Sequence, residues 1–357
     1  MNICYFGTFE PTYQRNRIIR KGLEKNSHEV ILCNTQYSGF MKVYVKLFFK
    51  WLKLNKNIDV IIVGETGFVL MPLAKMIGLL WGKPVILDAF FSVYQMNVYD
   101  RKLIPENSFA AKKMYLIEKI GCLLADAIIL DTFAHIDYFK RTFFLYHKKF
   151  LRILVGADSE VFDCKKYQHQ VREKCFTVLF WGTFIPLHGI EYIVKAAKRL
   201  ENQKDIVFKI IGMGQTYQEI VTIINELDIK NIELIGTVDE GILPGLIAKS
   251  DICLGIFNNS DKARNVLPHK VYQALAMKKP VITAETRAAA EVLKNGETAV
   301  FCEIANDESL AYEIMYLKNS PELRNKIGEK GYTLYIETLT PEKVVKPFCE
   351  YVKARWL

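Results

Sequence analysis

Short apolar runs alternate with segments of helical periodicity along almost the whole sequence, and this alternation restricts the fold more than any other feature. In the first half of the chain, the predicted strands span residues 3–6, 30–33, 60–63, 84–87 and 127–130. A strand followed by a helix and another strand favours a parallel sheet that is covered by helices on both faces. The sequence therefore predicts an α/β fold.

A polar stretch, residues 158–173, separates these strands from a second series. The second series spans residues 178–181, 207–211, 233–235, 252–256, 281–283 and 299–302, and helices are predicted at 321–337 and 341–355. The 357 residues exceed what one core usually organises. We therefore predict two doubly wound domains, 1–157 and 177–337, with a linker at 158–176. The helix in 338–357 is expected to cross back to the first domain.

Charge and cysteine usage narrow the possible partners. The net charge of +9 indicates an anionic partner, such as a nucleotide or a phospholipid surface. No nucleic-acid-binding motif accompanies the basic residues, so no nucleic acid partner is expected. The eight cysteines show no CxxC spacing, which predicts reduced thiols and no metal site. Without a signal-peptide pattern, and with Lys75 inside the apolar stretch 68–81, a cytoplasmic chain without a membrane span is expected.

Glycine-rich turns follow predicted strands in both halves, at Gly7, Gly64, Gly182 and Gly212. Such turns let backbone N–H groups and a helix N-terminus approach phosphate oxygens. Any α/β protein also needs tight turns at these places, so each turn alone has an equally good structural explanation. Gly212 and Gly214 do not form a dinucleotide-binding fingerprint, because Tyr217 occupies the place of the third glycine.

Residues 254–283 carry the most specific pattern. A strand leads into a polar loop with Lys262 and Arg264, and Pro268 is expected at the first position of a helix that contains Lys270 and Gln273. The open N–H groups of this helix and the two cations suit a diphosphate, and Gln273 is placed to reach a ribose. The alternative is a solvated basic loop before an ordinary helix.

This segment resembles the retaining glycosyltransferases of family 4, which have the GT-B fold of two Rossmann-like domains that face a cleft. The family pattern P-x-K-x-x-E-A-x-A is matched by Pro268-His269-Lys270-Val271-Tyr272-Gln273-Ala274-Leu275-Ala276, and Lys279-Pro280-Val281-Ile282 follows. Residues 180–189 and 236–238 also resemble family turns. The resemblance is strong in the second half and weaker before Gly156.

The resemblance implies a transferase that moves a sugar from a nucleotide-sugar, possibly a UDP-sugar, to an acceptor bound by the first domain. It needs no cofactor, since the nucleotide-sugar is a substrate, and no metal is expected. The residues assigned to donor binding are Gly7, Gly182, Thr183, His188, Gly212, Val238, Asn265, Val266, Leu267, Lys270 and Gln273.

The departures from the family pattern concern charged positions. Asn265 and Gln273 stand where the family has two glutamates, and Thr183 and His188 stand where it has an arginine and a lysine. Lys262 and Arg264 are assigned to supply the missing positive charge in catalysis. Asp88 stands at the place of a histidine near the reacting centre, and it is assigned to orient the acceptor; its alternative role is a helix N-cap.

Residues 41–56 predict a membrane-contacting helix. Lysines at 42, 46, 50, 53 and 56 fall within an arc of about 120° on a helical wheel, beside aromatic and aliphatic residues. This pattern is typical of a helix in a membrane interface, and the membrane contacts assigned are Lys42, Lys46, Lys50, Trp51 and Lys53. The alternative is a buried helix with one solvated basic face.

The complete prediction is a retaining glycosyltransferase of cell-surface polysaccharide synthesis that acts on a glycan, which the membrane pattern suggests is lipid-linked. It is expected to be cytoplasmic and bound peripherally, through anionic lipid, to the inner face of the cell membrane. The alternative function is a degenerate, non-catalytic GT-B protein that binds a partner glycosyltransferase at the membrane.

Overall fold

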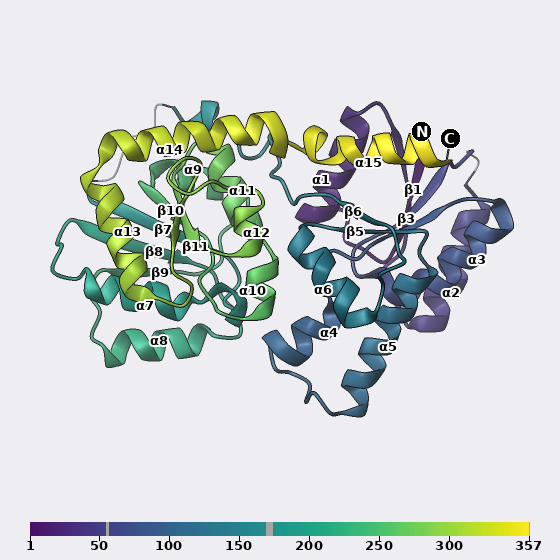
Figure 1. Cartoon of the computed structure of the whole chain (residues 1–357), viewed down its shortest axis with the longest axis horizontal. Helices are drawn as coiled ribbons and strands as arrows, with labels where there is room; N and C mark the ends of the chain where they lie inside the picture. The colour runs from purple at the N-terminus through teal and green to yellow at the C-terminus, as the bar shows by residue number, and fades with distance from the viewer. Residues whose placement is uncertain (55–56, 169–173, 357) are drawn as a thin grey trace. The chain divides into compact units, whose positions relative to one another are not determined.

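The structure, a computed structural model, describes residues 1–54, 57–168 and 174–356 and divides into two compact units (Figure 1). The first unit comprises Met1–Val155 and Pro341–Leu357, and the second comprises Gly156–Thr340. Each unit is built on a parallel sheet with flanking helices, so the predicted α/β fold with two doubly wound sheets is confirmed. Lys56 and residues 169–173 of the predicted linker lie outside the described residues.

The sheet of the first unit has the strand order β2-β1-β3-β4-β5-β6. Its strands are β1 (Asn2–Gly7), β2 (Glu29–Asn34), β3 (Val60–Val63), β4 (Val85–Asp88), β5 (Ala127–Leu130) and β6 (Phe150–Arg152). All neighbouring strands are parallel, with Ile3 paired to Val60 in the centre. The carboxyl ends of these strands therefore lie along one edge of the sheet.

Helices cover both faces of this sheet because alternate residues of each buried strand point to opposite sides. Ile3 and Tyr5 of β1 pack on the face with α1 (Gln14–Lys25) and α15 (Pro341–Trp356). Cys4 and Phe6 pack on the other face. That face is covered by α2 (Phe40–Leu52), η1 (Gly67–Leu70), α3 (Met71–Trp81), α5 (Phe109–Leu124) and α6 (Phe133–Phe143), and the short helices α4 (Val93–Gln95) and η2 (Met96–Asp100) precede α5.

The second unit repeats this plan with the strand order β12-β11-β10-β7-β8-β9. Its strands are β7 (Phe176–Trp181), β8 (Ile206–Ile211), β9 (Ile232–Ile235), β10 (Ile252–Leu254), β11 (Val281–Ala284) and β12 (Val300–Cys302). Its helices are η3 (Cys164–Tyr167), η4 (Pro186–His188), α7 (Ile190–Arg199), α8 (Tyr217–Glu226), α9 (Leu243–Lys249), α10 (Asp261–Asn265), α11 (His269–Ala276), α12 (Arg287–Ala290), α13 (Asp307–Asn319), α14 (Pro321–Leu334) and η5 (Tyr335–Leu339).

Two details of the helices differ from the predictions. Pro268 is the N-cap of α11, with extended backbone at ψ 157°, and His269 is the first helical residue. Trp51, assigned to the membrane surface, is only 6% exposed and packs edge-on against Trp81, with ring centroids 5.8 Å apart. Trp51 is therefore a core residue and cannot contact a membrane from this position, whereas the four lysines assigned with it are exposed.

Within the described part of the chain, none of the helices combines the length and the low polarity that crossing a bilayer requires.

The return of α15 to the first unit depends on close packing against Gly22 of α1. A Cβ atom at Gly22 would lie 2.2 Å from the carbonyl oxygen of Pro341 and 2.6 Å from Cγ2 of Val345. In an ordinary helix, alanine in place of glycine stabilises by about 1 kcal/mol. Here we expect Gly22→Ala to destabilise the first unit by about 1–3 kcal/mol, because backbone atoms cannot give way.

Urea unfolding of the full chain, followed by circular dichroism, measures this change. Glu24→Ala, at an exposed position of the same helix, is the matched control and should leave stability nearly unchanged. Stabilisation by Gly22→Ala would contradict the packing of α15 on α1.

Candidate functional site

The floor of the candidate site is formed by two glycines at the carboxyl ends of neighbouring strands in the second unit. Gly182 follows β7 and Gly212 follows β8. Their φ values of 146° and 136° are rarely adopted by residues that carry a side chain. A Cβ atom at Gly212 would lie 2.0 Å from the carbonyl oxygen of Gly182. The turns after β7 and β8 therefore pack against each other through main-chain atoms, and a side chain at Gly212 would not fit.

Lys270 lies beside this floor, on the first turn of α11. A Cβ atom at Gly182 would be 3.2 Å from Nζ of Lys270 and 3.2 Å from Cε1 of His188, so these three residues surround one point. Nζ of Lys270 lies 4.6 Å from the centre of the Phe180 ring, and the side chain is 4% exposed. Burial lowers the pKa of Lys270 to about 7.

No carboxylate or carbonyl oxygen among the described residues forms an ion pair or hydrogen bond with this ammonium group. A buried cation without a counter-ion costs free energy unless a ligand supplies the negative charge. The N-terminus of α11 adds to the attraction for an anion, since the Pro268 cap provides no side-chain hydrogen bond to the open N–H groups. The arrangement is suited to a phosphate or diphosphate.

Gln273, one turn further along α11, is already engaged. Its Oε1 accepts a hydrogen bond of 2.7 Å from Nε1 of Trp181, the last residue of β7, and both side chains are buried. The amide N–H groups of Gln273 are the part that a ribose hydroxyl can use. Trp181 was not assigned to the site from the sequence, although it lies in the segment 180–189 that resembles a family turn.

Thr183 and His188 belong to the turn between β7 and α7. Nδ1 of His188 lies 2.6 Å from the carbonyl oxygen of Thr183, and the imidazole is edge-on to Phe180 with centroids 5.6 Å apart. The His188 side chain is buried, and Thr183 is exposed. The structure therefore places both predicted residues at the site, with His188 as a wall beside Lys270.

The two cations assigned to catalysis lie on α10, a five-residue helix that packs on η4. Ala263, which lies between them in the sequence, forms a small apolar cluster with Leu187 and Ile256. Lys262 is buried, whereas Arg264 is exposed and donates from Nη2 to Oδ1 of Asn259. Helix α10 thus holds Lys262 and Arg264 next to the turn that carries His188.

The remaining assigned residues of the second unit surround this group. Asn265 and Leu267 are buried and Val266 is partly buried, in the segment that leads into α11. Val238 is partly buried after β9, which lies beside β8 and two strands away from β7. Gly182, Thr183, His188, Gly212, Lys270 and Gln273 are brought together, and Val238 lies towards the edge of the sheet.

Asp88 and Gly7 lie in the first unit, at the carboxyl ends of β4 and β1. Asp88 has no exposed surface, and Arg15 donates to it from Nε at 3.1 Å and from Nη2 at 3.0 Å. Arg15 also donates to the carbonyl oxygen of Ile153 at 2.8 Å. A carboxylate enclosed in this way is not placed to orient an acceptor, and the N-cap role is also wrong, because Ser92 caps α4.

Glu65, after β3, is a second residue of this edge that the sequence analysis left unassigned. Its Oε1 accepts a hydrogen bond of 3.3 Å from Nδ2 of Asn16. Burial, followed by the charge of Asp88, raises the pKa of the Glu65 carboxyl to about 8. The edge of the first sheet therefore holds a carboxyl group that is largely protonated at neutral pH.

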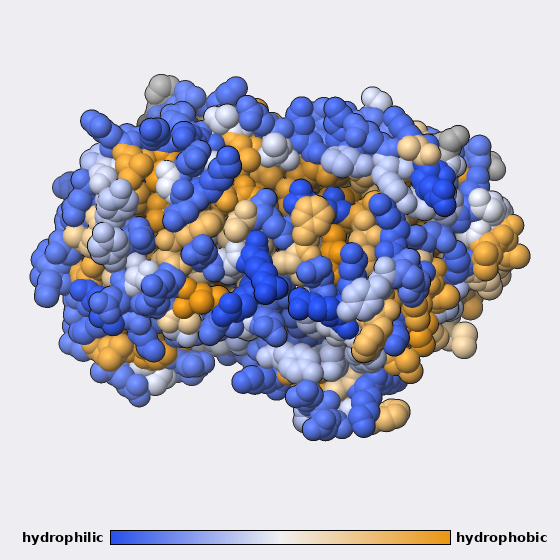
Figure 2. Space-filling view, viewed as in Figure 1, coloured by the Kyte–Doolittle hydropathy of each residue, from blue (hydrophilic) through white to orange (hydrophobic). Residues whose placement is uncertain are grey.

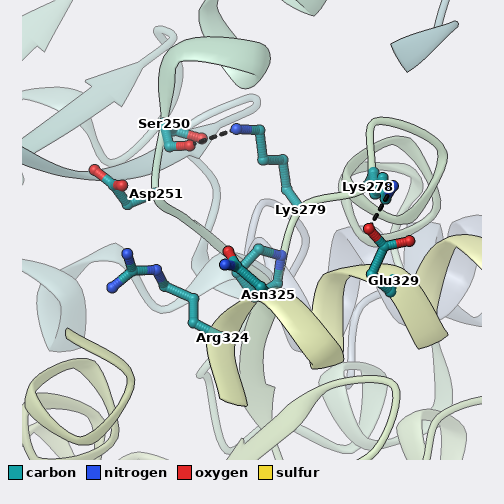
Figure 3. Close-up of a pocket in the computed structure, with 8 residues that line it drawn as sticks. Ser250, Asp251, Lys278, Lys279, Arg324, Asn325 and Glu329 are labelled. Carbon is teal, nitrogen blue, oxygen red and sulfur yellow. Dashed lines mark hydrogen bonds and ion pairs between the residues drawn. The ribbon is translucent and has the colours of Figure 1, made fainter. Parts of the chain in front are cut away.

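A polar cavity of about 310 Å³ lies elsewhere in the second unit, at the amino ends of β10 and β11 (Figure 3). Its cations are already paired: Nζ of Lys279 donates to the carbonyl oxygen of Ser250 at 2.8 Å, and Lys278 forms an ion pair with Glu329. Ligands of open parallel sheets bind beyond the carboxyl ends of the strands. This cavity is therefore separate from the candidate site.

Comparison with known families matches the chain to the model described as glycosyl transferases group 1, over residues 162–334. Among curated proteins, the chain is 28% identical to an uncharacterized glycosyltransferase of Methanocaldococcus jannaschii over 153 residues, 43% of this chain and 41% of that protein. It is 22% identical to N-acetyl-alpha-D-glucosaminyl L-malate synthase of Bacillus anthracis over 184 residues, 51% of this chain and 46% of that protein. The chain thus spans less than half the length of these relatives.

Solved structures show the same fold over the whole chain. HepE of Anabaena, solved in complex with UDP, has a TM-score of 0.69 at 14% identity and covers 99% of this chain and 100% of its own. Sucrose-phosphate synthase of Thermosynechococcus elongatus has a TM-score of 0.74 at 12% identity and covers 99% of this chain and 98% of its own. These neighbours show the GT-B fold, and with the group 1 match they support a glycosyltransferase.

The Arg15–Asp88 pair gives a prediction for the first unit. Asp88→Asn leaves the buried guanidinium without its counter-ion, so we expect a loss of stability of about 3–5 kcal/mol. Urea unfolding measures this loss, and Asp137→Asn on the outside of α6 is the control. An Asp88→Asn variant as stable as the wild type would show that the pair does not hold the first unit together.

Proposed function

We propose that this chain is a glycosyltransferase that moves a sugar from a nucleotide-diphosphate sugar to a glycan or lipid-linked glycan acceptor. The observation that carries the proposal is the buried ammonium group of Lys270, which lies over Phe180 and beside Gly182 and has no counter-ion among the described residues. A donor diphosphate supplies the charge that this site lacks. The similarity to HepE, solved with UDP and with UDP-glucose, supports a UDP-sugar as the donor.

The reaction breaks the bond between the anomeric carbon and the diphosphate oxygen, and it forms a bond from the same carbon to the acceptor oxygen. The acceptor hydroxyl gives its proton to an oxygen of the leaving nucleotide diphosphate, on which negative charge grows as the bond breaks. Lys270 and the N-terminus of α11 stabilise this charge, and Arg264 and Lys262 on α10 are assigned to the outer phosphate oxygens. Retention of configuration and independence of metal ions, both implied by the family resemblance, are part of the proposal.

The first unit is assigned to the acceptor. Because Arg15 binds Asp88 in the interior, we assign Asp88 to the stability of this unit. Glu65, at the same sheet edge, has a carboxyl group whose pKa is raised to about 8. The exposed lysines of α2 support contact with an anionic membrane, where a lipid-linked acceptor would lie. We place the protein on the inner face of the cell membrane, in the synthesis of a cell-surface polysaccharide.

A second candidate function has one specific observation in its favour. Gln273 replaces the glutamate of the family pattern, and its side-chain oxygen holds the indole of Trp181. Asn265 replaces the other glutamate. A chain that has lost both carboxylates could bind a partner glycosyltransferase at the membrane without catalysis. Transfer of sugar from a labelled UDP-sugar by the purified protein separates the two functions.

The charge of Lys270 predicts a pH-dependent affinity for UDP. The folded-state pKa of about 7 lies below the ordinary value for lysine, so the ammonium is partly deprotonated at neutral pH before UDP binds. Bound diphosphate favours the protonated form, so binding takes up a proton, and affinity falls as the pH rises above 7. Calorimetry in two buffers of different ionisation enthalpy measures the proton uptake.

Lys270→Met removes this proton uptake and weakens UDP binding, and Lys294→Met, at an exposed position of the same unit, changes neither. The same linkage affects folding. Since the pKa is lowered on folding, the wild type loses stability as the pH falls from about 10 to about 7, and Lys270→Met removes this loss. UDP binding by Lys270→Met with unchanged affinity and proton uptake would refute the site.

The α10 cations give a separate prediction. Lys262→Ala and Arg264→Ala should each weaken UDP binding by about 1–3 kcal/mol, the range of hydrogen bonds to charged groups. Calorimetry at fixed pH and salt measures the effect. Lys249→Ala, at the end of α9, is the control. Unchanged affinity in both α10 variants would limit the diphosphate site to Lys270 and the backbone of α11.

A further inference from the structure

We propose that the outer surface of α2, α3 and α5 inserts apolar side chains into the headgroup layer of an anionic lipid bilayer. The inference rests on the membrane contact of the proposed function, and it specifies the surface and the mode of that contact. The sequence pattern indicated one helix and included Trp51, which is buried. The structure identifies different apolar side chains on three neighbouring helices.

Helix α2 has three distinct sectors. At about 100° per residue, four of its five exposed apolar side chains fall within an arc of about 80°, and its lysines occupy the next arc of the same width. These four are Met41, Val45, Phe49 and Leu52, and the lysines are Lys42, Lys46, Lys50 and the C-cap Lys53. The fifth exposed apolar side chain, Phe40 at the start of the helix, lies outside this arc. The third sector, with Val43, Leu47 and Trp51, packs in the core. An apolar sector beside a basic one is typical of helices that lie in a membrane interface.

Helices α3 and α5 extend the apolar surface. Leu79 and Leu80 at the end of α3 are 71% and 66% exposed. Met76 and Trp81 on α3 and Leu116, Ile120 and Leu123 on α5 are also exposed. The contact between Trp51 and Trp81 joins α2 to α3, and α3 packs on α5. Figure 2 shows apolar side chains gathered over the part of the first unit where Figure 1 labels α2 and α3.

The charges of these helices fit an anionic surface. None of the three helices carries an exposed acidic side chain, because their single acid, Glu118, is 1% exposed. The cations on them are the lysines of α2, Lys112, Lys113 and Lys119 on α5, and Lys75 on α3, which is ion-paired with Asp126 just after α5. Helices that expose leucines and lysines but no carboxylate of their own are suited to lipid headgroups and acyl chains together.

The same charges disfavour a second copy of this chain as the occupant. Self-association through this surface would bring the lysine sector of one α2 close to the lysines of the other copy, and like charges at an interface oppose association. A bilayer with anionic headgroups pairs with the lysines and takes up the apolar side chains at the same time. We therefore commit to lipid as the occupant.

The test uses the full-length protein and sedimentation with vesicles of phosphatidylcholine, alone or mixed with phosphatidylglycerol. Leu79→Ser combined with Leu80→Ser should lower the partition coefficient on anionic vesicles by about tenfold, at low and at high salt, because apolar burial is lost. Lys42→Gln combined with Lys53→Gln should lower it only at low salt, because salt screens the charge interaction. Ile242→Ser combined with Tyr312→Ser, at exposed sites of the second unit, is the control.

A second measurement reports insertion directly. Fluorescence of Trp81 should be quenched by lipids with brominated acyl chains, and Trp81→Phe identifies its share of the signal. Equal sedimentation of the leucine variant and the wild type, or no quenching that Trp81→Phe removes, would overturn the inference. A dimer in light scattering without vesicles that the leucine variant abolishes would also overturn it, in favour of self-association.

UDP binding separates this inference from the proposed function. The leucine variant should bind UDP as the wild type does, since the candidate donor site lies in the other unit. Vesicle insertion without UDP binding would refute the proposed transfer and leave the membrane surface intact. UDP binding and sugar transfer without insertion would refute the membrane surface alone.

Discussion

The ammonium group of Lys270 is buried in a place where no counter-ion from the described residues stabilises its charge. Two features of the chain make this arrangement possible. Gly182 has no side chain to fill the space beside Nζ of Lys270, and the face of the Phe180 ring forms a cation–π contact with this group. Because the N-terminus of α11 points to the same region, the positive potential there is the sum of a helix end and a desolvated charge. The order of strands β7 and β8 and the glycines after them position this group.

The first unit uses a buried cation in the opposite way. Arg15 is also fully enclosed, but two oxygens of Asp88 and the carbonyl oxygen of Ile153 satisfy its donors. One cation is thus neutralised within the protein and the other has no counter-ion among the described residues, although the two sheets share one architecture. Burial alone therefore does not identify a functional group. Arg15 and Lys270 are both buried, and they differ in whether the protein supplies an internal partner for the charge.

The sequence predicted the parts of the fold that depend on local pattern. Strands such as β3 and β5 are buried on both faces, so they read as continuous apolar runs. Strand β6 was missed, because it has only three residues and two of them are partly exposed. The burial of Trp51 could not be predicted from periodicity. Helix α2 has two apolar sectors, and only tertiary packing decides which of them faces the core. The pairs Trp181–Gln273 and Arg15–Asp88 join residues 92 and 73 positions apart, and no local pattern encodes them.

The placement of α15 has a consequence for how the chain is made. The second unit is one continuous segment, whereas the core of the first unit includes Val344, Val345 and Phe348 near the C-terminus. During translation, all residues of the second unit are therefore synthesised before α15, which completes the core of the first unit. Until then, the α1 side of the first sheet lacks its cover, and nascent chains that stall early would expose that surface to chaperones.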